Sequence, residues 1–309
     1  MLRQAILKTA ANRRARRAIE ATPMARSLVE RFVAGEDIPA AVRISRRIRA
    51  AGCMATLDYL GEDTTDRTHA VRVAGQYVRL LDSLAAAGLT DQTEVSIKLS
   101  ALGQALPVDG EAVALDNAAR ICDAAQMAGT TVTVDMEDHT TTDSTLGIIA
   151  QLRRDFPQTG AVVQAYLRRT EGDCRDLATP GSRVRLCKGA YREPASVAYQ
   201  SRAEVTQAYL RCAEILMAGP GHPMLATHDP DLITAGIQLG ASRASGTRGY
   251  EIQMLFGVRP REQQRLADQG HQVRVYVPYG EEWYGYLMRR LAERPANLLF
   301  FLRALTSRN

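Results

Sequence analysis

The hydrophobic positions of this chain follow two alternating patterns along most of its length. Eight short apolar runs, rich in β-branched residues, are separated by stretches with helical periodicity and by glycine or proline. The expected strands are Met54–Leu60, Glu94–Leu99, Thr131–Met136, Ala161–Leu167, Arg183–Cys187, Pro223–Thr227, Tyr250–Leu255 and Val273–Val277. The expected helices between them include Thr68–Ala87, Gly110–Ala128, Thr145–Phe156, Ser196–Ala218 and Pro230–Leu239.

Strands that alternate with helices in this number predict an α/β fold, a TIM-like (β/α)₈ barrel. A doubly wound sheet is the alternative, and it would usually carry a glycine-rich turn after its first strand. The turn here, Leu60-Gly-Glu-Asp63, has one glycine, and GxGxxG occurs nowhere in the chain. We expect residues 51–309 to form a catalytic barrel and residues 1–50 a helical arm that precedes it.

Basic residues gather at the start of the chain. Residues 1–50 hold twelve Arg or Lys and four Asp or Glu, an excess of +8; the whole chain carries +5, which leaves −3 for residues 51–309. The Arg13–Arg17 cluster could contact a nucleic acid or an anionic membrane surface. No aromatic residues interleave with these arginines, which favours a solvated helical arm. We therefore expect no nucleic-acid partner and keep a peripheral contact with the inner membrane as an open alternative.

The remaining composition predicts a cytoplasmic protein. The chain has no run of about 18 apolar residues and no signal peptide with an apolar centre. Its five cysteines are scattered and include no CxxC pair, which indicates reduced thiols rather than a disulfide framework.

Polar residues close each predicted strand, at the end where parallel barrels build their active sites. They lie in Gly61-Glu-Asp63, Lys98-Leu-Ser100, Asp135-Met-Glu-Asp-His139, Gln164-Ala-Tyr166, Arg185-Leu-Cys-Lys-Gly-Ala-Tyr191, Thr227-His-Asp229, Glu251-Ile-Gln253 and Tyr276-Val-Pro-Tyr279. One such residue is a weak signal, because it can serve as a structural hydrogen-bonding group. Polar groups at all the strand ends indicate an active site, since burying them unpaired would cost several kcal/mol.

The last predicted helix, Glu282–Arg294, carries two adjacent arginines. Tyr286, Arg289, Arg290 and Glu293 are spaced so that they can share one face. Paired guanidinium groups suit the bidentate capture of a carboxylate or phosphate. A salt-bridged, solvent-exposed helix explains these residues equally well when the helix is considered alone.

At these residues the sequence resembles the proline dehydrogenase family. The family motifs stand here as Ile97-Lys-Leu-Ser-Ala101, Asp135-Met-Glu137, Gln164-Ala-Tyr166, Arg185-Leu-Cys-Lys-Gly-Ala-Tyr191, Ala226-Thr-His228 and Tyr286-Leu-Met-Arg-Arg-Leu-Ala-Glu293. The resemblance runs from Leu57 to Asn297 and is closest to the monofunctional bacterial form. It implies a nucleotide-binding flavoprotein with non-covalent FAD. Such an enzyme oxidises L-proline to Δ1-pyrroline-5-carboxylate by hydride transfer to flavin N5 and passes the electrons to a quinone-type acceptor.

The resemblance also implies which residues bind the substrate. Arg289 and Arg290 would pair with the proline carboxylate, with Lys98 beside it. Glu293 and Glu62 would hold the two arginines when substrate is absent. Asp135 would orient Lys98, and Tyr276 would crowd a 4-hydroxyl group on the ring. Further contacts with proline are implied for Tyr191, Leu186 and Tyr286, and the catalytic residues are expected to be Asp135, Arg185, Lys98 and Tyr276.

Contacts with the cofactor are implied for residues of the third to sixth strands. Arg185 would hydrogen-bond the N5 edge of the flavin and stabilise the charge that reduction adds. Met136 and Gln164 would contact the isoalloxazine ring. The phosphate and ribose would lie against Lys188, Gly189 and Ala190, and the adenosine half against Thr227 and His228. Arg192 departs from the fused enzymes of the family, which often have tryptophan there.

Three other functions are compatible with parts of the pattern. A metal-dependent hydrolase would use Asp135, Glu137, Asp138 and His139, but the paired histidines common in such sites are missing, so we expect no metal. A Schiff-base aldolase would use Lys98 or Lys188, although nearby acids should keep either lysine charged. A flavin-binding protein without catalytic activity is the third alternative.

Overall fold

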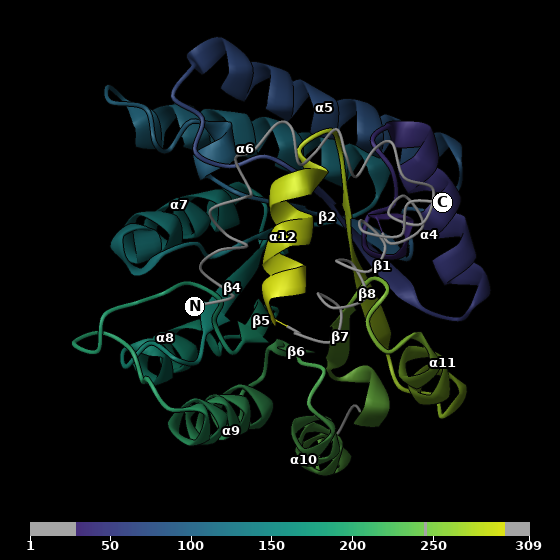
Figure 1. Cartoon of the computed structure of the whole chain (residues 1–309), viewed down its shortest axis with the longest axis vertical. Helices are drawn as coiled ribbons and strands as arrows, with labels where there is room; N and C mark the ends of the chain where they lie inside the picture. Colours follow the sequence, from purple (N-terminus) through teal and green to yellow (C-terminus); the bar gives the residue numbers. More distant parts are fainter. Residues whose placement is uncertain (1–28, 244–245, 294–309) are drawn as a thin grey trace, which may run out of the picture.

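The computed structural model describes residues 29–243 and 246–293, in which eight parallel strands form a closed barrel (Figure 1). The strands are β1 (Met54–Tyr59), β2 (Thr93–Ile97), β3 (Val132–Val134), β4 (Gly160–Gln164), β5 (Arg183–Cys187), β6 (His222–Ala226), β7 (Glu251–Leu255) and β8 (Val273–Tyr279). Each strand pairs with its neighbours in the chain, and β8 closes the barrel on β1, with Tyr276 beside Thr56. The predicted TIM-like barrel is confirmed.

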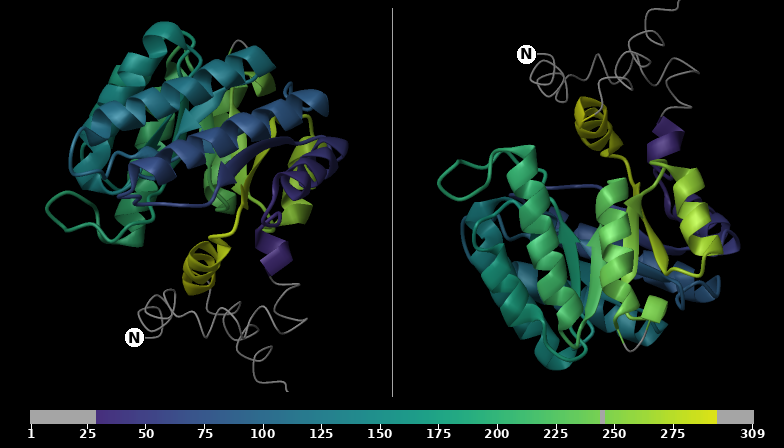
Figure 2. Two further views of the ribbon diagram at one scale, coloured as in Figure 1. Left: turned by 90° about the horizontal axis from the view of Figure 1, so that it is seen from above. Right: turned by 90° about the horizontal axis from the view of Figure 1, so that it is seen from below.

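Helices that connect the strands cover the outside of the barrel (Figures 1 and 2). They are α5 (Arg67–Ala86), α6 (Gly110–Ala128), α7 (Thr142–Asp155), α8 (Thr170–Leu177), α9 (Arg202–Ala218), α10 (Pro230–Ala241) and α11 (Pro260–Asp268), with short 3₁₀ turns η1 (Ser100–Leu102), η2 (His139–Thr141) and η3 (Gly246–Arg248). Helices α8 and α11 were not predicted. Each is short and mostly polar, and buries two residues, too few for a visible hydrophobic period.

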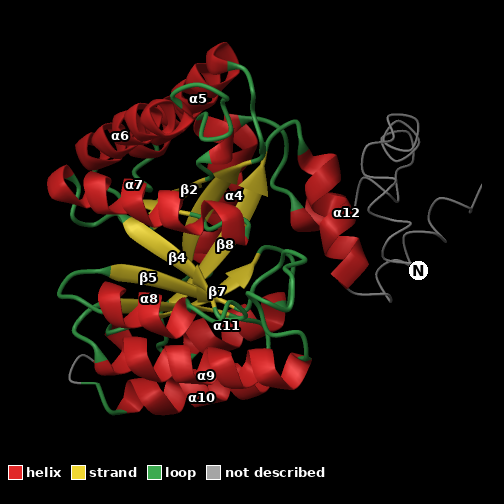
Figure 3. Cartoon of the chain, turned by 90° about the vertical axis from the view of Figure 1, so that its left-hand side faces the viewer, coloured by secondary structure: helices red, strands yellow, loops and turns green. Residues whose placement is uncertain are grey.

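The helix after β8 does not complete this outer ring. Helix α12 (Trp283–Glu293) lies beyond the strand ends, across one mouth of the barrel (Figures 1 and 3). It begins shortly after Tyr279, so this mouth is the carboxyl end of the strands. The place that an eighth helix occupies in a regular barrel, against β8 and β1, belongs instead to α4 (Ile38–Ala50). Ile44 and Ile48 of α4 are buried in the same core as the strands, so this part of the expected arm packs on the barrel.

The start of α12 is tied to the segment before α4. The Gly280 N–H donates to the Gly35 carbonyl at 2.9 Å, and the Trp283 indole donates to the Glu36 carboxylate at 2.7 Å. The side chains of Trp283 and Met288 are buried. These contacts hold the helix with the predicted arginine pair at the mouth.

The interior of the barrel is polar. Successive residues of a strand point to opposite sides of the sheet. Hydrogen bonds join Glu94 of β2 to Arg183 of β5, and Asp135 after β3 to Tyr276 of β8; these strands are not neighbours, so the bonds cross the interior. The apolar core lies between the strands and the helices, where Leu57 is fully buried.

No helix in the described part of the chain is long and apolar enough to cross a lipid bilayer. The Arg13–Arg17 cluster lies outside the described residues, so the solvated arm stays a prediction and the membrane contact an open alternative.

Candidate active site

The four predicted catalytic side chains meet inside the carboxyl end of the barrel. Asp135 is at their centre: its Oδ1 accepts from Arg185 Nη1 at 2.7 Å and its Oδ2 accepts from the Tyr276 hydroxyl at 2.6 Å. Lys98 Nζ lies 3.8 Å from the same Oδ2. The four residues come from β2, β3, β5 and β8 or the positions just after them, so only barrel closure brings them together.

Lys98 has a nearer carboxylate partner, Asp58 in β1, which was not predicted. Lys98 Nζ lies 2.7 Å from each Asp58 carboxylate oxygen, and the Asp58 side chain is 2% exposed. Burial opposes the charge on Lys98, but Asp58, and after it Asp135 and Glu62, raises the lysine pKa above its usual range. Lys98 is therefore a cation at neutral pH. This argues against a Schiff-base role, which needs a neutral amine.

Arg185 is held rigidly in the interior. Its Nε donates to Gln253 Oε1 at 2.6 Å, and its guanidinium carbon lies 5.2 Å from the centre of the Tyr276 ring. Burial works against the charge of Arg185, but Asp135 and then Glu94 together outweigh burial and raise the arginine pKa. Burial and then Asp135 raise the pKa of Tyr276 well above 10, so this phenol remains a hydrogen-bond donor.

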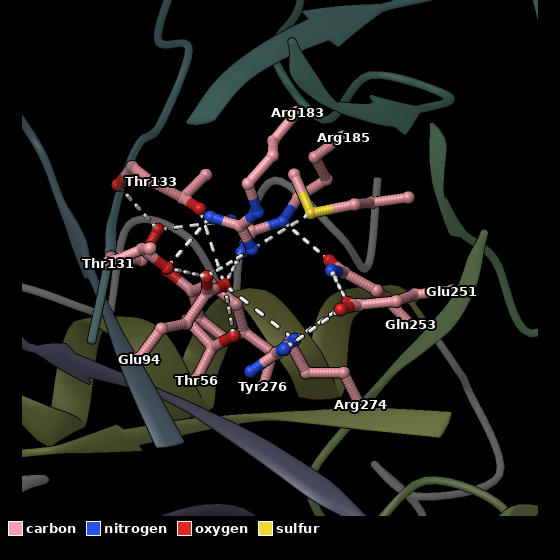
Figure 4. Close-up of polar contacts among 12 residues, drawn as sticks. Thr56, Glu94, Thr131, Thr133, Arg183, Arg185, Glu251, Gln253, Arg274 and Tyr276 are labelled. Carbon is pink, nitrogen blue, oxygen red and sulfur yellow. Dashed lines mark hydrogen bonds and ion pairs between the residues drawn. The ribbon is translucent and has the colours of Figure 1, made fainter. Parts of the chain in front are cut away.

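Deeper in the barrel, a second group of charged residues forms ion pairs within the group (Figure 4). Arg274 binds Glu251 through two nitrogens, at 2.7 and 2.8 Å. Glu94 accepts from Arg183 at 2.5 Å, and one of its oxygens lies 3.4 Å from Arg185. Burial alone would raise the pKa of Glu94, but the arginines around it, Arg183 first, lower it to about 2. We call Glu94, Arg183, Glu251 and Arg274 the inner charge cluster.

Four buried polar residues that support the site were not predicted: Asp58, Glu94, Arg183 and Arg274. They lie within strands, whereas the predictions concentrated on strand ends. Their signal in the sequence is a polar residue at every second position, as in Glu94-Val-Ser-Ile-Lys98. The apolar residues between them face the helices outside the barrel. The alternating polar residues therefore face inward, and the pattern indicates a polar barrel interior.

Gln164, at the end of β4, has one end of its amide satisfied. Nε2 donates to the backbone carbonyls of Met136 at 3.2 Å and Glu137 at 2.6 Å. Both partners are acceptors, so they determine which end of the amide faces them. The Oε1 atom is buried and has no hydrogen-bond partner among the described residues. A buried acceptor in this state fits a bound group that offers an N–H donor.

The loop after β5 carries the residues expected to line the phosphate and ribose. Lys188 Nζ lies 2.9 Å from Asp229 Oδ2, while Ala190 and Tyr191 are exposed. Gly189 has a φ of +112°, and a Cβ there would lie 2.3 Å from the Tyr166 ring. This packing is a structural reason for glycine, in addition to the cofactor contact that the resemblance implies.

The residues expected at the adenosine half are fixed by contacts around β6 and β7. The Asp229 N–H donates to Thr227 Oγ1 at 3.1 Å. His228 Nε2 accepts from the Leu255 N–H at 2.8 Å, so its ring hydrogen is on Nδ1. Arg259 donates to the His228 carbonyl at 2.7 Å. Thr227 and His228 thus lie together at the same mouth as Lys98.

Other predicted contacts are not decided by the structure. Leu186 is fully buried in the apolar core and follows Arg185, which points inward, so its contact with substrate stays a prediction. Tyr286 is buried on α12. The side chains of Arg289, Arg290 and Glu293 lie outside the described set, so the clamp is supported by the position of its helix alone.

The residues suggested as metal ligands have other partners. Asp138 accepts from the Thr140 N–H at 2.8 Å, and the His139 ring contacts Glu193. Within residues 29–243 and 246–293, no three His, Cys, Asp or Glu residues are arranged to hold a metal ion.

The chain matches known proteins over most of its length. Residues 41–303 match the family model described as proline dehydrogenase. The chain is 38% identical over 275 residues to Proline dehydrogenase 1 of Bacillus subtilis (strain 168), covering 89% of each protein. It is also 38% identical over 281 residues to a proline dehydrogenase of Deinococcus radiodurans, covering 90% of each.

Solved structures agree with the fold. Proline utilization A from Bdellovibrio bacteriovorus, inactivated by N-propargylglycine, superposes with a TM-score of 0.80 at 25% identity. The match covers 87% of this chain and 33% of that one, so the chain spans a third of the larger protein.

Proposed function

The chain belongs to the proline dehydrogenase family, a family of proline-oxidising enzymes, and from this premise we propose its reaction in detail. It oxidises L-proline to Δ1-pyrroline-5-carboxylate by hydride transfer to N5 of a non-covalently bound FAD and passes the electrons to a quinone-type acceptor. The observation that carries the proposal is the group around Asp135. Lys98, Arg185 and Tyr276, which match the family motifs, all converge on that carboxylate.

The described residues fit a flavin at this mouth. The unpartnered Gln164 Oε1 would accept from an N–H of the ring, and the cationic Arg185 lies at the same end of the barrel. Lys188 and the Gly189 backbone, after β5, would hold the phosphates and ribose. Bound FAD would supply the acceptor for the hydride of proline.

Lys98 would bind the carboxylate of proline by its charge. Asp58 and Asp135 keep the lysine protonated, and the longer distance to Asp135 leaves that side able to adjust to a substrate. Arg289 and Arg290 would add bidentate contacts from α12. Two cationic elements from opposite sides would then fix the carboxylate.

Asp135 and Tyr276 would orient the reacting groups. Asp135 accepts from Arg185 and from the Tyr276 hydroxyl at once, so it fixes both side chains relative to each other. Tyr276 and Tyr191 would then form walls for the pyrrolidine ring. Holding the reacting carbon close to its acceptor would account for much of the rate enhancement, since positioning converts a bimolecular step into a local one.

The decisive experiment is purification of the chain with its native cofactor, followed by anaerobic titration with L-proline. We expect a yellow protein whose flavin absorbance bleaches on addition of proline. Bound flavin that proline does not reduce would favour a non-catalytic flavin protein. A colourless protein with bound metal, detected by elemental analysis, would favour the hydrolase.

The acceptor needs its own measurement, because only the family resemblance supports it. After reduction by proline, the flavin should be reoxidised faster by a soluble ubiquinone analogue than by dissolved oxygen. Stopped-flow absorbance resolves the two rates. Reoxidation by oxygen at an equal or higher rate would contradict the quinone assignment.

A further inference from the structure

Gln253 of β7 lies between the Asp135 group and the inner charge cluster. Its Oε1 accepts from Arg185 Nε at 2.6 Å, and its Nε2 donates to Glu251 Oε2 at 2.9 Å (Figure 4). The residue is 3% exposed. One amide therefore bridges the arginine of the site to a carboxylate of the cluster.

The two partners require an amide at this position. Arg185 offers only donors, and Glu251 offers only acceptors while it is ionised. Burial would raise the pKa of Glu251, but Arg274 first, with His222 and Arg183, lowers the pKa well below the usual range, so the carboxylate is charged. A carboxylate in place of Gln253 would repel Glu251, and an apolar side chain would leave both charged partners without their hydrogen bond.

The far end of this chain of contacts is anchored in the barrel wall. Arg274 holds Glu251 through two nitrogens and also donates to the Ala55 carbonyl of β1 at 2.9 Å. The chain of bonds thus runs from the backbone of β1 through the amide of Gln253 to Arg185. An arginine has several rotatable bonds, so a fixed partner at Nε determines where the rest of its guanidinium points.

Gln253 also separates two charges that would otherwise pair. Glu251 and Arg185 bind opposite ends of the same neutral amide. Without it, Arg185 would lose its partner at Nε, and Glu251 would compete with Asp135 for the arginine charge. A neutral spacer keeps the positive charge of Arg185 at the carboxyl end, where reduction of a flavin would add negative charge.

We propose that Gln253 is a positioning residue for proline oxidation: it holds Arg185 in place and keeps Glu251 from neutralising it. This role rests on the proposed function, because it assumes that Arg185 lies beside the flavin. It predicts that changes at Gln253 alter the flavin as well as the rate.

The test compares Gln253→Glu and Gln253→Met with Gln126→Glu, an exposed control on α6 that makes the same change of charge. The readouts are the midpoint potential of the bound flavin and kcat and KM as functions of pH. Both Gln253 variants should lower kcat by about 10- to 100-fold, the usual cost of removing a supporting partner, with KM nearly unchanged. The control should match the unmutated enzyme.

The carboxyl introduced by Gln253→Glu gives a second signature. It faces Glu251 on its own strand, Arg185 of β5 and Arg274 of β8, with Glu94 and Asp135 beyond them. When ionised it should lower the midpoint potential, since added negative charge disfavours reduction. At lower pH it should take up a proton, donate to Glu251 as the amide does, and restore part of kcat. Gln253→Met should show no such recovery.

Three outcomes would overturn the role. Midpoint potentials and kcat values equal to those of the unmutated enzyme would show that Arg185 needs no help from Gln253. Equal losses in both variants, without recovery at low pH, would indicate a purely structural position. If the unmutated, flavin-loaded chain is not reduced by L-proline, the proposed function itself fails, and the role fails with it.

Discussion

The two ends of the barrel interior contain the same kinds of side chain in different states. In the inner charge cluster, Arg274 and Glu251 form a closely matched pair with both contacts below 3 Å. At the carboxyl end, Lys98 is 2.7 Å from Asp58 but 3.8 Å from Asp135, and the Oε1 of Gln164 has no partner among the described residues. The charges of the inner cluster are paired with one another, whereas side chains at the carboxyl end can make further hydrogen bonds.

This difference shows how one strand can serve stability and chemistry together. Arg183 and Arg185 are two residues apart on β5 and both point inward, yet the first binds the cluster and the second binds Asp135. Buried ion pairs are weak sources of net stability but costly to break. We therefore expect changes in the cluster to affect folding, and changes at the mouth to affect substrate and cofactor.

The largest effect should follow Glu94→Gln. The change leaves Arg183, Arg185 and Arg274 in the interior with one negative charge fewer, and breaking a buried pair in this way costs about 3–5 kcal/mol of unfolding free energy. Urea denaturation of the flavin-loaded protein measures it. The exposed Gln126→Glu control should stay within about 0.5 kcal/mol. A loss as small as that of the control would show that the cluster does not stabilise the barrel.

The same variant should change how the free energy of unfolding depends on pH in acid. The pKa of Glu94 is about 2 in the folded chain and lies near 4.3 in an unfolded one, so its contribution is complete above about pH 4.3 and is lost as the pH falls toward 2. Glu94→Gln should flatten the dependence of unfolding free energy on pH in that interval. An unchanged slope would mean that other carboxylates, Glu251 first, dominate it.

The next effect concerns the arginine pair on α12. Arg289→Met or Arg290→Met should raise the Kd for proline by at least roughly 30-fold, about 2 kcal/mol, because a charged partner of the carboxylate is removed. Flavin content should stay nearly normal and stability should change little. Spectral titration with proline gives the Kd. Loss of the flavin instead would assign the helix to the cofactor and weaken the distinction between the two ends.

A smaller effect is expected from Asp58→Asn, measured on the alkaline side of the pH profile. The pKa of Lys98 is raised in the folded chain, chiefly by Asp58 among its partners, so the lysine stays charged until the pH passes that raised value. Removing the carboxylate lowers the pKa, and kcat/KM should fall at a pH lower by about one unit, equivalent to about 1.4 kcal/mol. An alkaline limb that does not move would show that Lys98 is not needed as a cation.

The smallest effect should follow Tyr276→Phe. It deletes one hydroxyl that donates to Asp135, which should cost about 1 kcal/mol, or about fivefold in kcat/KM. Tyr279→Phe is the matched control, because the buried Tyr279 hydroxyl has no hydrogen-bond partner within the described residues. Equal kinetics for both variants would remove Tyr276 from the site.

The sequence alone predicted the residues at strand ends. Lys98, Asp135 and Tyr276 each close a run with the period of a strand, and barrel geometry places such positions at one mouth. Glu94 was missed, and Gln253 was named at its strand end without a role, because the importance of both depends on partners far along the chain. Gln253 lies 68 positions from Arg185, and nothing local to either residue indicates that they meet.

The sequence also did not predict the path of the chain around β8. The pattern of α12 indicates a helix with one apolar face. It does not indicate whether that face packs on the outside of the barrel or across its carboxyl mouth. The choice depends on α4, whose own apolar face packs between β8 and β1 and leaves no place there for the last helix.

Local periodicity by itself therefore determined the class of the fold, the order of its strands and most of the polar residues at the carboxyl mouth, because these follow from spacing along the chain. Tertiary structure alone decided the pairing of the interior charges, the place of α12 and the state of each ionisable group. These depend on distances across the barrel, where burial makes every unpaired charge costly and each arginine takes the carboxylate that closure brings within reach. The group around Asp135 depends on both, because spacing along the chain predicted its residues and closure of the barrel decided their contacts.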